Sequence, residues 1–167
     1  DVTLEGIEFF ADSSTSSALF VLPYNDTEQS ALSLTITNSI IDGGGYQNGL
    51  SGSDIDELLI TGSTFTHSNT GVYITGGSVA NHHINESSFI ENYSNIYISN
   101  ECEGTFDATY NWWGSPEGPG GSVEGDVDTG NWYADEDDMG GGSLQSMIDA
   151  TECGGTLIVP EGDYDEH

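Results

Sequence analysis

Three segments of the chain share one pattern: LTITNSII at residues 34–41, LLITGSTF at 58–65 and HHINESSF at 82–89. Each segment starts 24 residues after the previous one. Their alignment gives two apolar columns with a serine column between them: Ile36, Ile60 and Ile84; Ile41, Phe65 and Phe89; and Ser39, Ser63 and Ser87. A repeat of this length indicates a solenoid, because one repeat cannot bury its own apolar side chains and must stack on its neighbours.

The apolar runs of the repeat are too short for helices, and their alternation, as in Leu34 and Ile36, has the period of a β-strand. A second short strand is expected after each block, at 71–74 and 95–98, with a weaker copy at 49–52. We therefore predict an all-β fold, a parallel β-helix of about four to five coils, in which successive coils lie about 4.8 Å apart. A leucine-rich-repeat horseshoe is the alternative, but its Leu and Asn spacing is missing.

The first coil is expected at residues 2–9, with Leu4 in the Ile36 column and Phe9 in the Ile41 column. The next block lies 32 residues further on, which predicts an insertion at 13–17 or 23–29. A coil at the first residues has an exposed edge that can accept further strand pairing. The predicted organisation is a β-helix (1–115), a Gly-, Pro- and acid-rich linker or arm (116–142) and a cap-like helix and strand (143–167).

The charge of the chain excludes several partners. It contains no Lys or Arg and 29 acidic residues, which gives a net charge of −29, whereas an ordinary domain of this length has roughly 20 basic residues. Nucleic acid and anionic lipid are therefore excluded as partners. Cations must screen the repulsion between the carboxylates. Adaptation to high salt alone is the alternative explanation. Apolar runs are also too short for membrane insertion.

Two further features suggest an extracellular protein at the cell surface. Cys102 and Cys153 permit one disulfide, either within a chain or between chains, with free buried thiols as the alternative. Sequons place candidate N-glycosylation sites at Asn25, Asn85 and Asn92. Since the chain starts at Asp1 without Met, we expect a processed product or an excised part of a longer protein.

The segment DATYNWWGSPEGP at 107–119 follows the repeat, and Asn-Trp-Tyr follows at 131–133. Together with the Asn-Ser-x-Phe coils, these motifs resemble secreted right-handed parallel β-helix repeat proteins of the pectin-lyase-like class, which are frequent on archaeal and bacterial surfaces. The resemblance covers residues 1 to about 133 and, separately, 143–167. In that family Asn-Trp-Trp-Gly ends the solenoid, whereas a short helix followed by a segment like LIVPEGDYDE, here at 157–166, begins one.

In this chain the segment that resembles a start therefore lies at the end, which suggests a mechanism of assembly. The uncapped first coil, with Val2 and Leu4, is expected to receive the terminal segment of the next copy. The apolar residues that would dock are Leu144, Met147, Ile148, Leu157, Val159 and Tyr164. Such a contact does not close on itself, so it builds a filament, sheath or surface layer (S-layer) of identical subunits. A covalent tandem within a longer chain is the alternative.

The resembled class includes polysaccharide lyases and hydrolases, but the sequence predicts no enzyme and no catalytic residue. The lyases use a basic Arg or Lys, which this chain lacks. The hydrolases place paired carboxylates near a His and a basic pair. Asp54 with Asp56, or Asp126 with Asp128, has no such surroundings in the sequence.

No cofactor is required, although Ca²⁺ or other cations can bind the oxygen-bearing residues of one acidic segment: Asp126, Asp128, Asn131 and Asp135. His82 and His83 are neighbours in a strand and point to opposite faces, so they do not predict a joint metal site. Four aromatic residues are expected to cover the upper end of the core: Trp112, Trp113, Trp132 and Tyr133. A carbohydrate-binding or adhesive surface module that uses these rings is the second functional hypothesis, and a divergent glycan-active enzyme the third.

Overall fold

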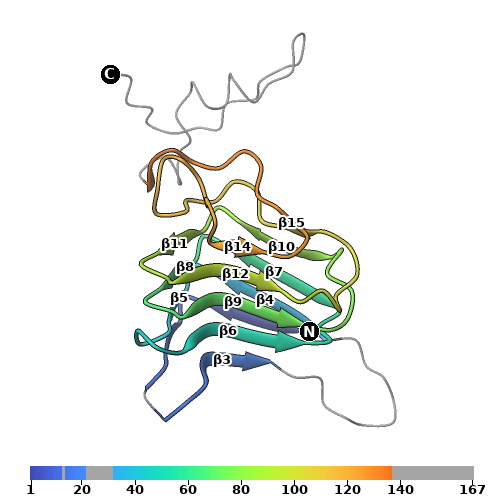
Figure 1. Cartoon of the computed structure of the whole chain (residues 1–167). Helices are drawn as coiled ribbons and strands as arrows, with labels where there is room; N and C mark the ends of the chain where they lie inside the picture. Colours follow the sequence, from blue (N-terminus) through green and yellow to red (C-terminus); the bar gives the residue numbers. More distant parts are fainter. Residues whose placement is uncertain (13, 22–31, 137–167) are drawn as a thin grey trace, which may run out of the picture.

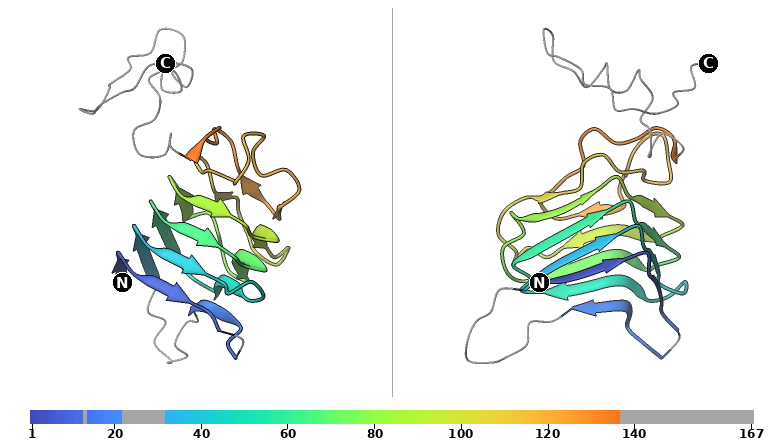
Figure 2. Two further views of the ribbon diagram at one scale, coloured as in Figure 1. Left: turned by 90° about the vertical axis from the view of Figure 1, so that its left-hand side faces the viewer. Right: turned by 180° about the vertical axis from the view of Figure 1, so that it is seen from behind.

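The computed structural model of the chain describes residues 1–12, 14–21 and 32–136. Over these ranges the chain forms fifteen β-strands and no helix. The strands wind into a parallel β-helix of about four coils that are stacked along one axis (Figures 1 and 2). The predicted all-β parallel solenoid is thus confirmed. Among these residues no helix has the length and apolar character to cross a bilayer.

Each complete coil gives one strand to each of three parallel sheets. Sheet A contains, from the lower to the upper end, β1 (Val2–Glu5), β4 (Ser33–Thr37), β7 (Glu57–Thr61), β10 (His82–Asn85), β13 (Phe106–Asp107) and β15 (Val127–Asp128). Sheet B contains β2 (Glu8–Phe10), β5 (Ile40–Asp42), β8 (Thr64–Thr66) and β11 (Ser88–Ile90). Sheet C contains β3 (Ser17–Val21), β6 (Asn48–Ser53), β9 (Thr70–Thr75), β12 (Ser94–Ile98) and β14 (Val123–Glu124).

The predicted columns are confirmed by the strand register. In sheet A, Leu4 pairs with Ile36, Ile36 with Ile60, and Ile60 with Ile84. In sheet B the column of Phe9 and Ile41 continues upwards in the same way. The column residues above the first coil are almost completely buried and form the core: Ile36, Ile60, Ile84, Ile41, Phe65 and Phe89.

The insertion in the first coil lies between sheets C and A. Val2 pairs with Leu34, 32 residues further on, and Ser17 still pairs with a residue 31 positions away, Asn48. From Ser33 onwards the offset in sheet A is 24. The extra residues therefore follow β3, which agrees with the second of the two predicted positions.

The corner between sheets A and B repeats the same backbone conformation in every coil. One residue per coil has a positive φ there: Gly6, Asn38, Gly62, Glu86 and Tyr110. The serine column follows immediately. Ser39 N–H donates to Ser63 Oγ at 3.2 Å, and Ser63 N–H donates to Ser87 Oγ at 3.1 Å. Each Oγ also donates to the carbonyl two residues before it, so these buried hydroxyls satisfy backbone groups where the ladder turns.

The segment after residue 115 differs from the expected arm in its described part, 116–136. β14 pairs with β12 and places Val123 beside Ile96. β15 pairs with β13 and places Val127 beside Phe106. Val123 and Val127 pack against the core and extend two of the three sheets. Two short apolar contacts thus suffice to hold a Gly- and acid-rich segment on the solenoid. The rest of the predicted arm, 137–142, and the predicted cap, 143–167, lie outside the described residues.

Candidate functional site

The first coil forms the lower end of the β-helix (Figure 1) and leaves three strand edges open. β1, β2 and β3 are the terminal strands of their sheets. Gly6 N–H donates to the Thr37 carbonyl above it at 3.1 Å. Because N–H groups alternate in direction along a strand, those of Thr3 and Glu5 point away from β4. In the described part of the chain, this edge is therefore a template for another strand.

The hydrophobic core also ends uncovered at the first coil. Val2 is 45% exposed, whereas Leu34, its partner one coil higher, is 4% exposed. Leu4 and Phe9 pack against the core from below but are only partly buried. The lower end thus combines free backbone groups with apolar side chains, which is the combination that a docking strand can use. Val2 and Leu4, two of the predicted assembly residues, lie on this edge.

The upper end has a different character. The Trp113 ring stacks on Phe89 with ring centroids 4.8 Å apart and is 4% exposed, so it closes the core. Trp132 is 43% exposed and lies over Gly118, where an added Cβ would stand 2.7 Å from the indole. β14 and β15 have two residues each. Very short strands are one way in which proteins prevent pairing at an edge. Of the four aromatic residues expected to cover this end, Trp113 does so most fully.

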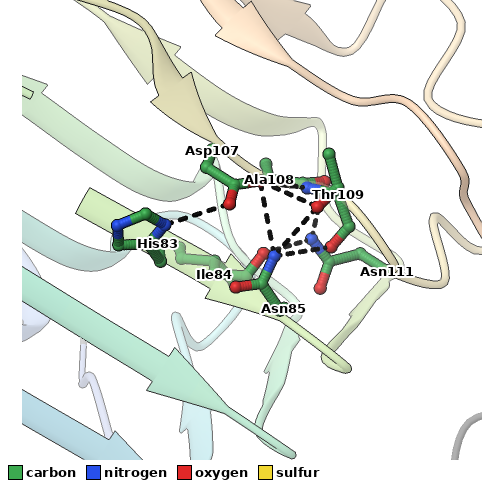
Figure 3. Close-up of polar contacts among 7 residues, drawn as sticks. All are labelled: His83, Ile84, Asn85, Asp107, Ala108, Thr109 and Asn111. Atoms are coloured by element: carbon green, nitrogen blue, oxygen red, sulfur yellow. Dashed lines mark hydrogen bonds and ion pairs between the residues drawn. The ribbon is translucent and has the colours of Figure 1, made fainter. Parts of the chain in front are cut away.

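A polar cluster on sheet A connects β10 with the coil above it (Figure 3). His83 Nδ1 lies 3.0 Å from Asp107 Oδ2, its neighbour in the register. Asp107 Oδ1 accepts hydrogen bonds from the Thr109 N–H at 3.0 Å and the Thr109 hydroxyl at 2.8 Å. Desolvation raises the pKa of Asp107, but the bonds from His83 and Thr109 outweigh it and leave that pKa lowered. The ionised carboxylate therefore acts as a tie between coils.

A second cluster lies at the corner between sheets B and C. His67 Nδ1 is 3.3 Å from Asp42 Oδ2, and His67 Nε2 is 2.9 Å from Glu91 Oε2. The three residues come from three successive coils. With both ring nitrogens directed at carboxylates, a protonated His67 bridges two acidic coils in a chain that has no Lys or Arg.

The four residues expected to bind a cation lie along the upper end. The carbonyls of Asp126 and Asp128 accept hydrogen bonds from β13 and the residue after it, and Asp128 Oδ1 accepts one from Gly130 N–H at 3.0 Å. Asn131 and Asp135 are exposed. Within the described ranges, no three His, Cys, Asp or Glu side chains are grouped so that they could hold a metal ion. A defined calcium site at these residues stays a prediction.

Cys102 is half-buried near the end of the last complete coil. Its thiol lies 3.6 Å from the Gly76 carbonyl oxygen. Desolvation raises its pKa, so the thiol is a weak nucleophile at neutral pH. Its expected partner, Cys153, is outside the described residues, and the disulfide stays a prediction.

Two of the three sequon asparagines are held by the solenoid. Asn85 Nδ2 donates to the Thr109 carbonyl at 2.9 Å, and Asn92 Nδ2 donates to the Phe65 carbonyl at 2.9 Å. Because an N-glycan is attached at Nδ2, glycosylation would disturb these contacts. Asn25 lies outside the described residues, as do the predicted docking residues Leu144, Met147, Ile148, Leu157, Val159 and Tyr164.

Sequence reasoning missed a row of rings on the outer face of sheet C. Tyr73 and Tyr97 stack with centroids 4.9 Å apart and an interplanar angle of 9°. Beside Tyr73 there is a pocket of about 350 Å³, to which Phe20 and Ser51 also contribute. The repeated tyrosine at equivalent positions of two blocks is the signal that could have revealed this row.

Comparison with known proteins adds no relative to these observations: no family model, no curated protein and no solved structure matches the chain.

Proposed function

We propose that this protein is a structural subunit that assembles head to tail into a filament, sheath or surface layer outside the cell. The lower coil of one subunit accepts a strand of the next, and the solenoid continues from copy to copy. Catalysis has no part in this role, and no cofactor is needed for it.

The observation that carries the proposal is the difference between the two ends. The lower end offers three open strand edges and an uncovered core, with Val2 45% exposed. The described upper end is closed by Trp113 and by strands of two residues. Two ends of unlike character favour a heterologous contact, in which different surfaces of identical copies meet and growth continues.

We infer that residues 143–167 are the docking segment. In sequence they combine an apolar stripe at helical spacing with the strand-like run TLIVP at 156–160. Strand addition would satisfy the outward N–H groups of Thr3 and Glu5, while apolar side chains cover Val2 and Leu4. At a net charge of −29, subunits repel one another, so assembly requires enough cations to screen the carboxylates.

An extracellular location follows from the same proposal. The pair Cys102 and Cys153 can lock docked copies covalently in an oxidising environment. A covalent tandem, in which a preceding part of a longer chain covers the first coil, would use the same surface.

Electron microscopy of the purified full chain, at high salt, tests the proposal. We expect elongated or sheet-like polymers, and monomers when residues 143–167 are deleted. The circular dichroism of the deletion variant should retain the β-solenoid signal. Polymers that dissociate only with a reductant would place the disulfide between chains. Strictly monomeric full-length protein, or unchanged polymers after the deletion, would refute the proposed mechanism.

A further inference from the structure

One row of side chains runs up the outer face of sheet C, with one residue from each coil. Phe20 pairs with Ser51, Ser51 with Tyr73, and Tyr73 with Tyr97. Three of the four positions carry an aromatic ring. The rings of Tyr73 and Tyr97 are in face-to-face contact, with centroids 4.9 Å apart. At Ser51 the row of rings is interrupted by one place.

The interruption leaves a slot of the right width for one flat ring. Phe20 and Tyr73 are two strand spacings apart, about 9.6 Å, and both line the pocket of about 350 Å³ that contains Ser51. A ring placed over Ser51 would stand one strand spacing from each aromatic neighbour. That is the spacing at which Tyr73 and Tyr97 already stack. The volume lies within the range of small-ligand sites.

The remaining lining of the slot is polar and uncharged. It consists of hydroxyl and amide side chains and one glycine: Ser16, Ser17, Asn48, Ser51, Ser53, Thr75 and Gly52. Ser51 Oγ accepts hydrogen bonds from Ser17 Oγ at 2.7 Å and from Asn48 Nδ2 at 3.1 Å. No acidic residue lines this slot, although the chain has 29 of them. A second pocket, near Cys102, is lined by Glu124 and Asp126.

We propose that this slot binds one neutral hexopyranose ring of a glycan. The two faces of such a ring carry C–H bonds, which pack against the Phe20 and Tyr73 rings. Its edge carries several hydroxyls, which match the hydroxyl and amide groups around Ser51. A phenol would offer a single polar tip to this lining. An anionic uronate is repelled by the net charge of −29.

This binding site is separate from the ends that the proposed assembly uses. The slot faces sideways from sheet C, so a polymer of stacked subunits would display one slot per copy. Repeated display raises the avidity for a glycan chain without new contacts.

Isothermal titration of the full chain with cellohexaose tests the proposal. This neutral oligosaccharide has equatorial hydroxyls, so both faces of each ring are free for stacking. We expect saturable binding of cellohexaose, and none of trigalacturonate or N-acetyltyrosinamide. Absence of cellohexaose binding, or binding of N-acetyltyrosinamide that a slot variant removes, would overturn the proposal.

Two variants locate the binding. Ser51→Tyr supplies the missing ring of the row, and Phe20→Ala removes one wall at a side chain that is 59% exposed, so that folding is preserved. Each should weaken cellohexaose binding by at least about tenfold. Tyr93→Ala is the matched control, because this aromatic side chain is 89% exposed and does not line the slot. Equal affinities for the parent and both slot variants would overturn the proposal.

Discussion

The indole of Trp113 lies parallel to the phenyl ring of Phe89, with centroids 4.8 Å apart and an angle of 16° between the ring planes. Phe89 stacks in turn on Phe65 at 5.0 Å. Three rings from successive coils thus form one continuous stack within the core. Trp113 is its last member and is 4% exposed. The motif that ends the repeat therefore also closes the core.

Replacing the last ring of this stack should destabilise the solenoid. We predict that Trp113→Ala lowers the free energy of unfolding by about 3–5 kcal/mol, because it leaves a cavity above Phe89. Trp113→Phe should cost less, since Nε1 is buried without a hydrogen-bond partner in the described structure. Urea unfolding measures both, with Trp132→Ala, at a 43% exposed ring, as the control. Equal losses for Trp113→Ala and Trp132→Ala would contradict the capping role.

The serine column should contribute through its acceptors. Ser63→Ala leaves the buried Ser39 N–H without its 3.2 Å acceptor and the Thr61 carbonyl without its 3.1 Å donor. We predict a loss of about 1–3 kcal/mol in the free energy of unfolding. Ser53→Ala, which removes only an exposed contact with Asp54, is the control and should change little. A Ser63→Ala variant as stable as the parent would show that the ladder adjusts without the hydroxyl.

His82 should make stability depend on pH. It occupies the core column of Leu34 and Leu58 and is 1% exposed, and burial lowers its pKa from 6.5 to about 4. Between these values the unfolded chain binds more protons than the folded one. Stability is therefore complete above about pH 6.5 and falls by up to about 3 kcal/mol as the pH decreases to about 4.

The variant His82→Leu isolates this effect. We predict that it removes the His82 contribution to the pH dependence and raises stability, because Nδ1 of His82 is buried without a partner in the described structure. Urea unfolding of parent and variant at pH 4.5 and 7.5 gives the difference directly. An identical pH dependence in the two proteins would exclude His82 as its source.

The open edge of β1 can be blocked without breaking the coil. The Thr3 N–H points away from β4, so Thr3→Pro removes a group that only an added strand would use. We predict that this variant folds but forms far fewer polymers in electron microscopy and light scattering. In Leu4→Pro the lost N–H faces β4, so the first coil itself should be destabilised. Normal polymer growth by Thr3→Pro would argue against strand addition at β1.

Cations should stabilise the chain by diffuse screening. Raising NaCl from 0.1 to 1 M shortens the Debye length from about 10 to about 3 Å, and we predict a Tm increase of at least about 3 °C. The double variant Asp126→Asn with Asp128→Asn should respond to CaCl₂ as the parent does, because the described residues contain no group of three metal-binding side chains. A calcium response that disappears in this variant would instead locate a defined site there.

The sequence by itself determined the solenoid, its 24-residue register and its core. A strand points alternate side chains inwards, and each coil repeats the last, so Ile36, Ile60 and Ile84 had to stack. The same logic placed Leu4 and Phe9 in the first coil and left its edge open. These features depend on spacing within the chain, which the residues display directly.

Only the tertiary structure decided what meets on the outer face and at the upper end. Leu50 pairs with Val72, 22 residues further on, although the offset in sheet A is 24, because the corners of the coils differ in length. A constant period therefore does not predict that Phe20, Ser51 and Tyr73 form one row. Likewise, Val123 and Val127 are isolated apolar residues in an acidic segment, and their place on the solenoid depends on β12 and β13 being there to receive them.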